Sequence, residues 1–133
     1  MIHVPLEKLA FIVIKARTFD VKVEPVDQDD GSNPADDGSR SVLEDYAEDA
    51  TLGELEAALG ELNDDEMDEL LAIVWTGRGD FQKSDWREAL GLARERRRHG
   101  ARYLTGMPLL ADYIEEGLDV LGYSLEDLEA RHL

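Results

Sequence analysis

The chain has 133 residues, the length of one ordinary domain, and contains no cysteine, which excludes disulfides, thiolate catalysis and cysteine-bound metals. Its 31 acidic residues against 14 lysines and arginines give a formal net charge of −17. Because that charge repels polyanions, it argues against nucleic acid and against an anionic membrane surface as partners. The apolar run at residues 11–14 is far too short to span a bilayer, and the first residues lack the pattern of a secretory signal. We therefore expect one cytoplasmic domain over residues 1–133.

The first predicted helix runs from Pro5 to about Phe19. Proline suits the first position of a helix, where its missing N–H group would have no partner. The β-branched run 12–14 leaves a strand as the alternative. We favour a helix because apolar residues recur every three or four positions without a turn signal, at Leu6, Leu9, Ala10, Val13 and Ala16.

Residues 24–41 are predicted to form a long, mobile, acidic loop. They contain two prolines, two glycines and five aspartates, with almost nothing apolar. Such a stretch cannot bury enough surface to offset the entropy that it would lose on ordering. The loop lies in an acidic region, residues 20–56, which carries thirteen acidic and two basic side chains, net −11.

Capping signals and apolar spacing predict the next helices. After a short helix at residues 42–47, residues 51–54 (TLGE) and 63–66 (NDDE) both have the spacing of a capping box, in which the first and fourth side chains bond each other's backbone N–H groups. A broad apolar face follows over residues 67–75, so we expect this helix to be the most buried.

Glycines and prolines predict where the remaining helices begin and end. Gly77 and Gly79, which tolerate positive φ, end the buried helix in a turn. Ser84 and Asp85 then cap a helix that starts near Trp86 and ends in basic residues, with Gly100 as its C-terminal cap.

The last helices complete an all-α fold. Pro108 opens a helix that Gly122 closes, and a short terminal helix spans residues 124–131. The chain is therefore predicted to be a compact bundle of five or six helices with one long acidic loop. The inner residues of the helix after Pro108 are expected to be Leu109, Leu110, Tyr113, Ile114, Leu118 and Leu121.

No set of residues has the spacing of a catalytic, cofactor-binding or metal site. The three histidines, at positions 3, 99 and 132, form no pair at metal-ligand spacing, and neither a nucleophile elbow nor a phosphate or dinucleotide loop occurs. Carboxylates gather at positions 64, 65, 68 and 69 and at positions 115, 116 and 119, and those at 65, 68 and 69 share a helix face that could in principle hold a hard cation. The favoured interpretation is a solvated acidic face.

The candidate working surface combines the turn after Trp75 with a basic corner. Residues 78–102 carry eight basic and four acidic side chains, net +4, in an otherwise acidic chain. Because arginines pair readily with carboxylates, this cluster either binds an acidic ligand or partner, or is neutralised by neighbouring acidic helices. Trp75 is expected to extend the core face. The candidate partner or anion surface consists of Trp75, Arg78, Asp80, Arg94, Arg97, Arg98, Arg102 and Tyr103.

Two segments carry a resemblance to a known family. Residues 62–80 read LNDDEMDELLAIVWTGRGD, and residues 103–122 read YLTGMPLLADYIEEGLDVLG. With them, the chain from Leu9 to Gly122 resembles a bacterial family known as domain of unknown function 3775. The resemblance implies no activity, cofactor or catalytic residue, and the acidic loop at 24–41 matches none of its motifs.

The leading hypothesis is a small cytoplasmic helical module that binds another protein and has neither a catalytic centre nor a cofactor. Tryptophan and arginine, both present in the candidate surface, dominate interface hot spots. One alternative is a carboxylate- or metal-dependent hydrolase, which would need a Glu-x-x-His motif on each of two helices, and the chain does not contain two such motifs. The other is an acidic mimic of nucleic acid that blocks a basic partner. A homodimer is an open alternative, and neither nucleic acid nor a membrane is expected as a partner.

Overall fold

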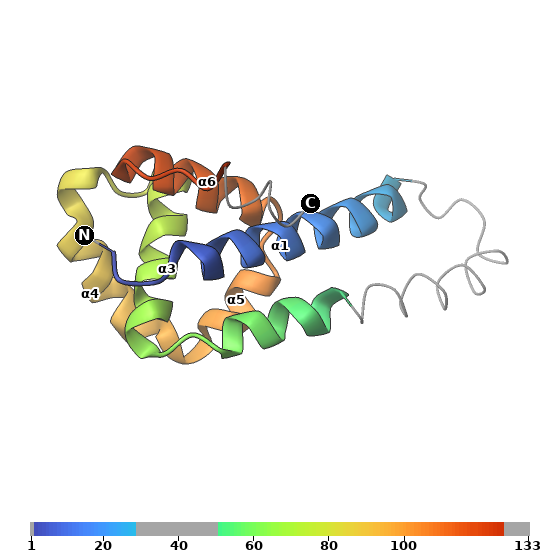
Figure 1. The fold of residues 1–133 in the computed structure, drawn as a ribbon, viewed down its shortest axis with the longest axis horizontal. Helices are drawn as coiled ribbons and strands as arrows, with labels where there is room; N and C mark the ends of the chain where they lie inside the picture. The colour runs from blue at the N-terminus through green and yellow to red at the C-terminus, as the bar shows by residue number, and fades with distance from the viewer. Residues whose placement is uncertain (1, 29–50, 127–133) are drawn as a thin grey trace, which may run out of the picture.

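A computed structural model describes residues 2–28 and 51–126, and the part of the chain that it describes is built from helices without a strand. The predicted all-α fold is confirmed. Short 3-10 turns, Lys83–Asp85 and Arg97–His99, flank the fourth helix. The α-helices are α1 (Leu6–Gln28), a helical segment over residues 51–60, α3 (Asp64–Arg78), α4 (Trp86–Arg96), α5 (Gly100–Thr105) and α6 (Leu110–Leu121) (Figure 1).

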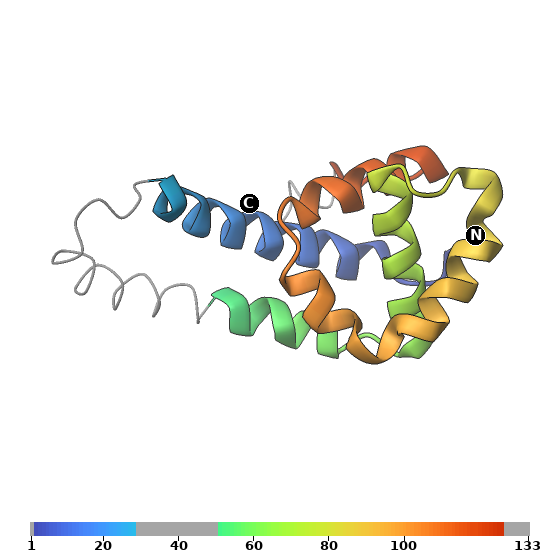
Figure 2. The same cartoon turned by 180° about the vertical axis from the view of Figure 1, so that it is seen from behind.

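The longest described helix is α1, which begins beside α3 and extends beyond the other labelled helices in both views (Figures 1 and 2). It packs against α6 and buries the predicted apolar face, including Leu9 and Val13. The helix continues to Gln28, however, so the predicted end near Phe19 is wrong.

The predicted acidic loop therefore does not begin at residue 24. The backbone over residues 24–28 is helical and includes Pro25. Proline in a helix removes one backbone hydrogen bond and favours a kink, but a helix can continue past it. The rest of the predicted loop, residues 29–41, lies outside the described residues.

The central helix is α3, whose residues 66–76 are all buried, and the predicted apolar face over residues 67–75 lies within this stretch. Its predicted capping box is confirmed: Asn63 Oδ1 accepts from the Glu66 N–H group at 2.8 Å, and Glu66 Oε1 accepts from the Asn63 N–H group at 3.0 Å. Gly79, with φ 91°, ends the helix in the left-handed conformation that favours glycine.

Two glycines let α3 and α6 cross in backbone contact. A Cβ atom on Gly77 would lie 2.0 Å from the carbonyl oxygen of Tyr113, and one on Gly117 would lie 2.0 Å from that of Ile73. Both distances are impossibly short, so neither position can carry a side chain in this arrangement. Of the two glycines expected to adopt positive φ, only Gly79 does so; Gly77 is helical and is required for the close approach.

The start and end of α4 differ from the prediction. The Asp85 carboxylate accepts from the backbone N–H group of Gln82 at 3.0 Å, so it caps the 3-10 turn before α4, and the buried Trp86 begins the helix itself. Gly100 does not cap α4, whose C-cap residue is Arg97; it follows the 3-10 turn, is the first residue of α5 and has a helical φ of −59°. A Cβ atom there would lie 2.9 Å from the Met67 sulfur, so glycine at 100 lets α5 approach α3.

The last helix, α6, begins after a turn rather than at Pro108. Leu109 has φ 63° and is 52% exposed, so the prediction that it lies inside is wrong. The fixed φ of proline suits a turn as well as a first helical position. Gly122 closes α6 with φ 94°, as predicted. The apolar residues of the helix itself are buried as expected at Leu110, Ile114, Leu118 and Leu121.

Three further predictions fall at the edges of the described chain. The predicted helix at 42–47 lies outside the described residues, as do residues 127–131 of the terminal helix. Glu126 is helical, and its N–H group donates to Ser124 Oγ at 3.3 Å. Thr51 is itself helical and buried, whereas its predicted capping box required a residue with non-helical backbone at this position.

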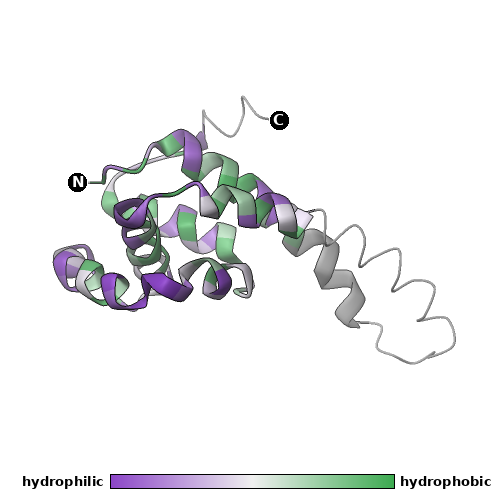
Figure 3. Ribbon diagram, turned by 90° about the horizontal axis from the view of Figure 1, so that it is seen from below, coloured by the Kyte–Doolittle hydropathy of each residue, from purple (hydrophilic) through white to green (hydrophobic). Residues whose placement is uncertain are grey.

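The helices surround one apolar core. Figure 3 shows apolar and hydrophilic residues interspersed along the helices, as expected when each helix has a buried and a solvated side. The buried apolar residues form one connected cluster. Over residues 2–28 and 51–126, none of the helices combines the length and the apolar character that crossing a membrane requires.

Candidate functional site

Three acidic residues near the start of α3 are buried: Glu66, Asp68 and Glu69. The predicted solvated acidic face is correct for Asp64 and Asp65, which are exposed, but wrong for Asp68 and Glu69. A buried carboxylate is stable only when donors satisfy it. Each of the three has such donors from elsewhere in the chain.

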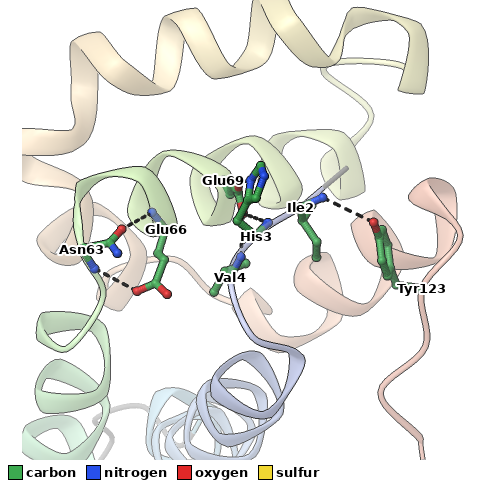
Figure 4. A network of polar contacts seen from close by, with 7 residues as sticks. All are labelled: Ile2, His3, Val4, Asn63, Glu66, Glu69 and Tyr123. Atoms are coloured by element: carbon green, nitrogen blue, oxygen red, sulfur yellow. Dashed lines mark hydrogen bonds and ion pairs between the residues drawn. The ribbon is translucent and has the colours of Figure 1, made fainter.

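Glu69 binds the segment that precedes α1 (Figure 4). Its Oε1 atom accepts from the backbone N–H groups of His3 at 2.7 Å and Val4 at 2.8 Å, and its Oε2 atom lies 2.9 Å from His3 Nδ1. The Ile2 N–H group donates to the Tyr123 hydroxyl at 3.3 Å. These bonds join the first residues to α3 and to the turn after α6. Such long-range contacts leave no local pattern in the sequence.

Glu66 combines a capping role with an ion pair. The carboxylate that accepts from Asn63 also lies 3.1 Å from Lys8 Nζ on α1. The hydrogen bond from the Asn63 backbone is the main cause that lowers the pKa of Glu66 below its usual 4.5; burial acts in the opposite direction, and Lys8 lowers the pKa further.

Asp68 binds Arg97 through two parallel hydrogen bonds. Arg97 Nε donates to Oδ1 at 3.0 Å and its NH2 group donates to Oδ2 at 2.8 Å, while NH1 lies 3.0 Å from Asp64 Oδ2. Burial alone would lower the pKa of Arg97, but its bonds to Asp68 and Asp64 raise it above the usual value. Arg97 is therefore a structural tie between α3 and the turn after α4. For this arginine, the predicted neutralisation by an acidic helix is confirmed.

A pocket of about 540 Å³ lies beside the other end of α3, and we call it the Tyr103 pocket. One wall is a single face of the continuous stretch α4–α5, whose lining residues are three to four positions apart. The opposite wall comes from the end of α3 and the turn after it. The volume lies within the usual range for ligand sites. The lining residues are Leu92, Glu95, Arg96, His99 and Tyr103 on the first wall, and Trp75, Asp80 and Phe81 on the second.

The Tyr103 pocket has an apolar, largely aromatic lining and a charged rim. The rings of Trp75 and Phe81 are 6.1 Å apart between centroids and tilted by 46°, which is a favourable aromatic arrangement. Trp75 is buried, as predicted, whereas Tyr103 is 41% exposed. The charged lining residues and His99 are all exposed. An amphipathic group can therefore place an apolar part against the rings and a polar part at the rim.

The Tyr103 hydroxyl joins the two walls of the pocket. Trp75 Nε1 donates to it at 3.1 Å, and the NH1 group of Arg78 donates to it at 2.7 Å. The Nε atom of Arg78 also lies 3.6 Å from Asp80 Oδ2. Arg78 therefore contacts both a carboxylate and the phenol oxygen.

The structure brings together only part of the predicted surface. Trp75, Asp80 and Tyr103 line the pocket, and Arg78 touches two of them. Arg94 lies elsewhere, beside a hollow near His3, and Arg97 is committed to Asp68. The two remaining members, Arg98 and Arg102, are exposed and form no ion pair within the described residues.

Five pocket residues were absent from the predicted surface. Four of them, at positions 92, 95, 96 and 99, share the helical spacing that also leads to Tyr103. That spacing was a usable signal, but it was obscured because these positions mix one apolar residue with three charged or polar ones. Phe81 follows the turn after α3, and no periodic pattern includes it.

The described residues contain no cluster of potential metal ligands. Within the residues whose side chains are described, no group of three or more histidine, aspartate or glutamate residues is arranged to hold a metal ion.

The fold and the pocket define a small all-α protein with an amphipathic pocket between the end of one helix and the face of the next two. The family described as "Protein of unknown function (DUF3775)" matches residues 52–123, and the chain belongs to this family. The match confirms the resemblance in residues 62–80 and 103–122 and includes every residue that lines the Tyr103 pocket. No curated protein and no solved structure matches the chain.

Proposed function

We propose that this protein is a non-catalytic module that binds another protein through the Tyr103 pocket. The observation that carries the proposal is the combination of an apolar lining with an exposed charged rim. Protein interfaces have the same anatomy, with an apolar centre surrounded by polar groups. An apolar side chain from a partner would bury itself between Phe81 and Leu92, and the rim would fix its orientation.

The residue types of the pocket support binding to a protein. Tyrosine, tryptophan and arginine are enriched among the residues that dominate interface energies. Tyr103 is exposed but held by two hydrogen bonds, so little side-chain entropy would be lost when a partner covers it. Arg96 forms no ion pair with the described residues, so its guanidinium is available for a partner.

The buried acids of α3 favour the binding module over the hydrolase alternative. Glu66, Asp68 and Glu69 each bind backbone N–H groups or cationic side chains of this chain. A carboxylate that accepts such bonds contributes to the fold, and part of its acceptor capacity is already used. An acidic mimic of nucleic acid, in turn, would use exposed carboxylates on a convex surface and would give the pocket no role.

Selection from a displayed library of random peptides tests the proposal. Leu92→Trp fills the pocket, and Val120→Trp on α6, at a position 47% exposed, is the matched control. We expect the wild type and Val120→Trp to enrich the same motif with an apolar residue, and Leu92→Trp to lose it. Enrichment of the same motif by all three proteins, or of no motif by any of them, contradicts the proposal.

A further inference from the structure

The hydrogen bonds of the Tyr103 hydroxyl determine what it can offer a ligand. A phenol oxygen has two acceptor positions and one O–H donor. Trp75 Nε1 and Arg78 NH1 both donate to this oxygen, at 3.1 Å and 2.7 Å. The O–H hydrogen has no acceptor among the described residues. The group that Tyr103 presents to the pocket is therefore a donor.

The charge of Arg78 strengthens that donor. A hydrogen bond from a cation polarises the phenol, and chains of hydrogen bonds reinforce one another. Arg96 adds a second guanidinium on the same wall of the pocket as Tyr103. Within the described chain, Arg96 forms no ion pair. An incoming acceptor therefore meets a polarised O–H group and an available cation.

Two carboxylates on the rim act in the opposite direction. Asp80 is partly compensated, because its Oδ2 atom lies 3.6 Å from Arg78 Nε. Glu95 is exposed and has no such partner within the described residues. The O–H group of Tyr103 favours a ligand with a negative charge, whereas the carboxylate of Glu95 favours a ligand with a positive charge. Binding of peptides of opposite charge separates these two effects.

From this arrangement, we infer that the Tyr103 pocket selects a peptide segment in which an apolar side chain is followed by a carboxylate. The inference rests on the proposed function and names the chemistry of the partner. The apolar side chain lies against Phe81 and Leu92, and the carboxylate accepts from the Tyr103 hydroxyl and pairs with Arg96.

The net charge of −17 does not prevent such binding at physiological salt. At about 0.15 M ionic strength the Debye length is about 8 Å, so carboxylates on the far side of the protein are screened. A contact made at hydrogen-bond distance is screened much less. The measurements below therefore use that ionic strength.

Four labelled peptides that differ at two positions test the inference by fluorescence anisotropy. Within one neutral Gly/Ser sequence they carry Phe-Glu, Phe-Gln, Phe-Lys or Ala-Glu. We expect the Phe-Glu peptide to bind about three- to five-fold more tightly than Phe-Gln, because an exposed ion pair is worth up to about 1 kcal/mol, which corresponds to about five-fold. Phe-Lys should bind more weakly than Phe-Gln, and Ala-Glu should not bind measurably.

Charge variants of the protein locate the effect. Arg96→Gln should reduce the preference for Phe-Glu over Phe-Gln, and Glu95→Gln should increase it. Arg87→Gln, also exposed on α4 but outside the pocket, should leave the preference unchanged. All three substituted side chains are exposed, so we expect each variant to fold like the wild type. Circular dichroism checks that each variant is folded before its peptide binding is compared.

The outcomes distinguish this inference from the proposed function. Tighter binding of Phe-Lys, weakened by Glu95→Gln, overturns the inference and leaves the proposed function in place. Equal binding of Phe-Glu, Phe-Gln and Phe-Lys also overturns it. If no phenylalanine peptide binds, the inference fails, and the library selection with Leu92→Trp decides the proposed function separately.

Discussion

Gly77 and Gly117 face each other where α3 crosses α6, and a Cβ atom on Gly77 would lie only 2.9 Å from the backbone nitrogen of Gly117. These glycines set the distance between the two helices that contact each other most extensively. Because Gly77 precedes Arg78 and the pocket turn, the crossing also positions one wall of the Tyr103 pocket.

A methyl group at the crossing should destabilise the protein. In Gly117→Ala the new Cβ atom meets the Ile73 carbonyl oxygen at 2.0 Å, so backbone must move rather than a flexible side chain. We expect a loss of about 3 kcal/mol or more, at the upper end of overpacking costs. Gly91→Ala in α4, where a Cβ atom meets nothing within 4 Å, is the control and should gain up to about 1 kcal/mol. Urea unfolding measures both, and equal stability of Gly117→Ala and the wild type would disprove the close crossing.

Loss of the Glu69 charge should weaken the attachment of the first residues. Glu69→Gln replaces an ionised acceptor of the His3 and Val4 N–H groups by a neutral amide. Hydrogen bonds to charged groups contribute about 1.5–3 kcal/mol, so we expect a thermal destabilisation of that order. Asp65→Asn, at an exposed position of the same helix, should change stability by less than about 0.5 kcal/mol. Amide hydrogen exchange at Val4 should accelerate only in Glu69→Gln, and unchanged exchange argues against the attachment.

The lowered pKa of Glu66 predicts a pH-dependent contribution to stability. A carboxyl group whose pKa is lower in the folded than in the unfolded state stabilises the fold fully above its unfolded pKa. That contribution disappears as pH falls from the usual value of 4.5 through the lower folded value. The stability difference between the wild type and Glu66→Gln should therefore be constant near neutral pH and shrink below about pH 4.5. Chemical unfolding at several pH values measures it, and a difference that grows with acidity reverses the sign of this account.

The tryptophan beside the pocket should be more important for stability than the hydroxyl that it contacts. Trp75 is 6% exposed, and truncating a buried aromatic residue costs about 3–5 kcal/mol, which is the expected loss for Trp75→Ala. Tyr103→Phe removes the hydroxyl that accepts from the indole and guanidinium N–H groups, and we expect this loss to cost about 1 kcal/mol. Thermal unfolding compares the two variants. A nearly native stability of Trp75→Ala would show that the indole does not belong to the core.

Added salt should raise the melting temperature. The net charge of −17 makes the folded chain repel itself, and raising NaCl from about 0.01 to 0.15 M shortens the Debye length from about 30 to 8 Å. The pairs of Glu66 with Lys8 and of Asp68 with Arg97 involve buried carboxylates, so they are screened less than the exposed acids. A melting temperature that falls steadily with salt would show that such pairs outweigh the repulsion.

Local signals predicted the parts of the fold that local chemistry determines. The capping box at Asn63 and Glu66 lies within one turn, and Gly79 adopts the left-handed conformation that its position suggested. Gly77 and Gly100 were both predicted to end a helix, but each of them instead lets two helices approach closely. Their role depends on which helix lies opposite, at Tyr113 and at Met67, and spacing along the chain does not reveal that.

Three of the eight residues that line the Tyr103 pocket could be predicted from local signals. Trp75, Asp80 and Tyr103 stood out by residue type near turns, and they meet in the pocket. Arg97 was part of the same predicted surface, yet its side chain binds Asp68 on α3. Other arginines of the cluster are exposed to solvent. Which arginine binds α3 depends on the 3-10 turn after α4, which the helical periodicity did not predict.

The indole N–H signals of the two tryptophans provide the most direct test that the Tyr103 pocket is the binding surface. Trp75 donates to the Tyr103 hydroxyl, whereas Trp86 begins α4 outside the pocket. In ¹H–¹⁵N spectra of the wild type titrated with a peptide selected from the library, the Trp75 indole signal should shift progressively and the Trp86 signal should stay in place. A bound peptide that leaves Trp75 unmoved, or that shifts Trp86 instead, would contradict the account.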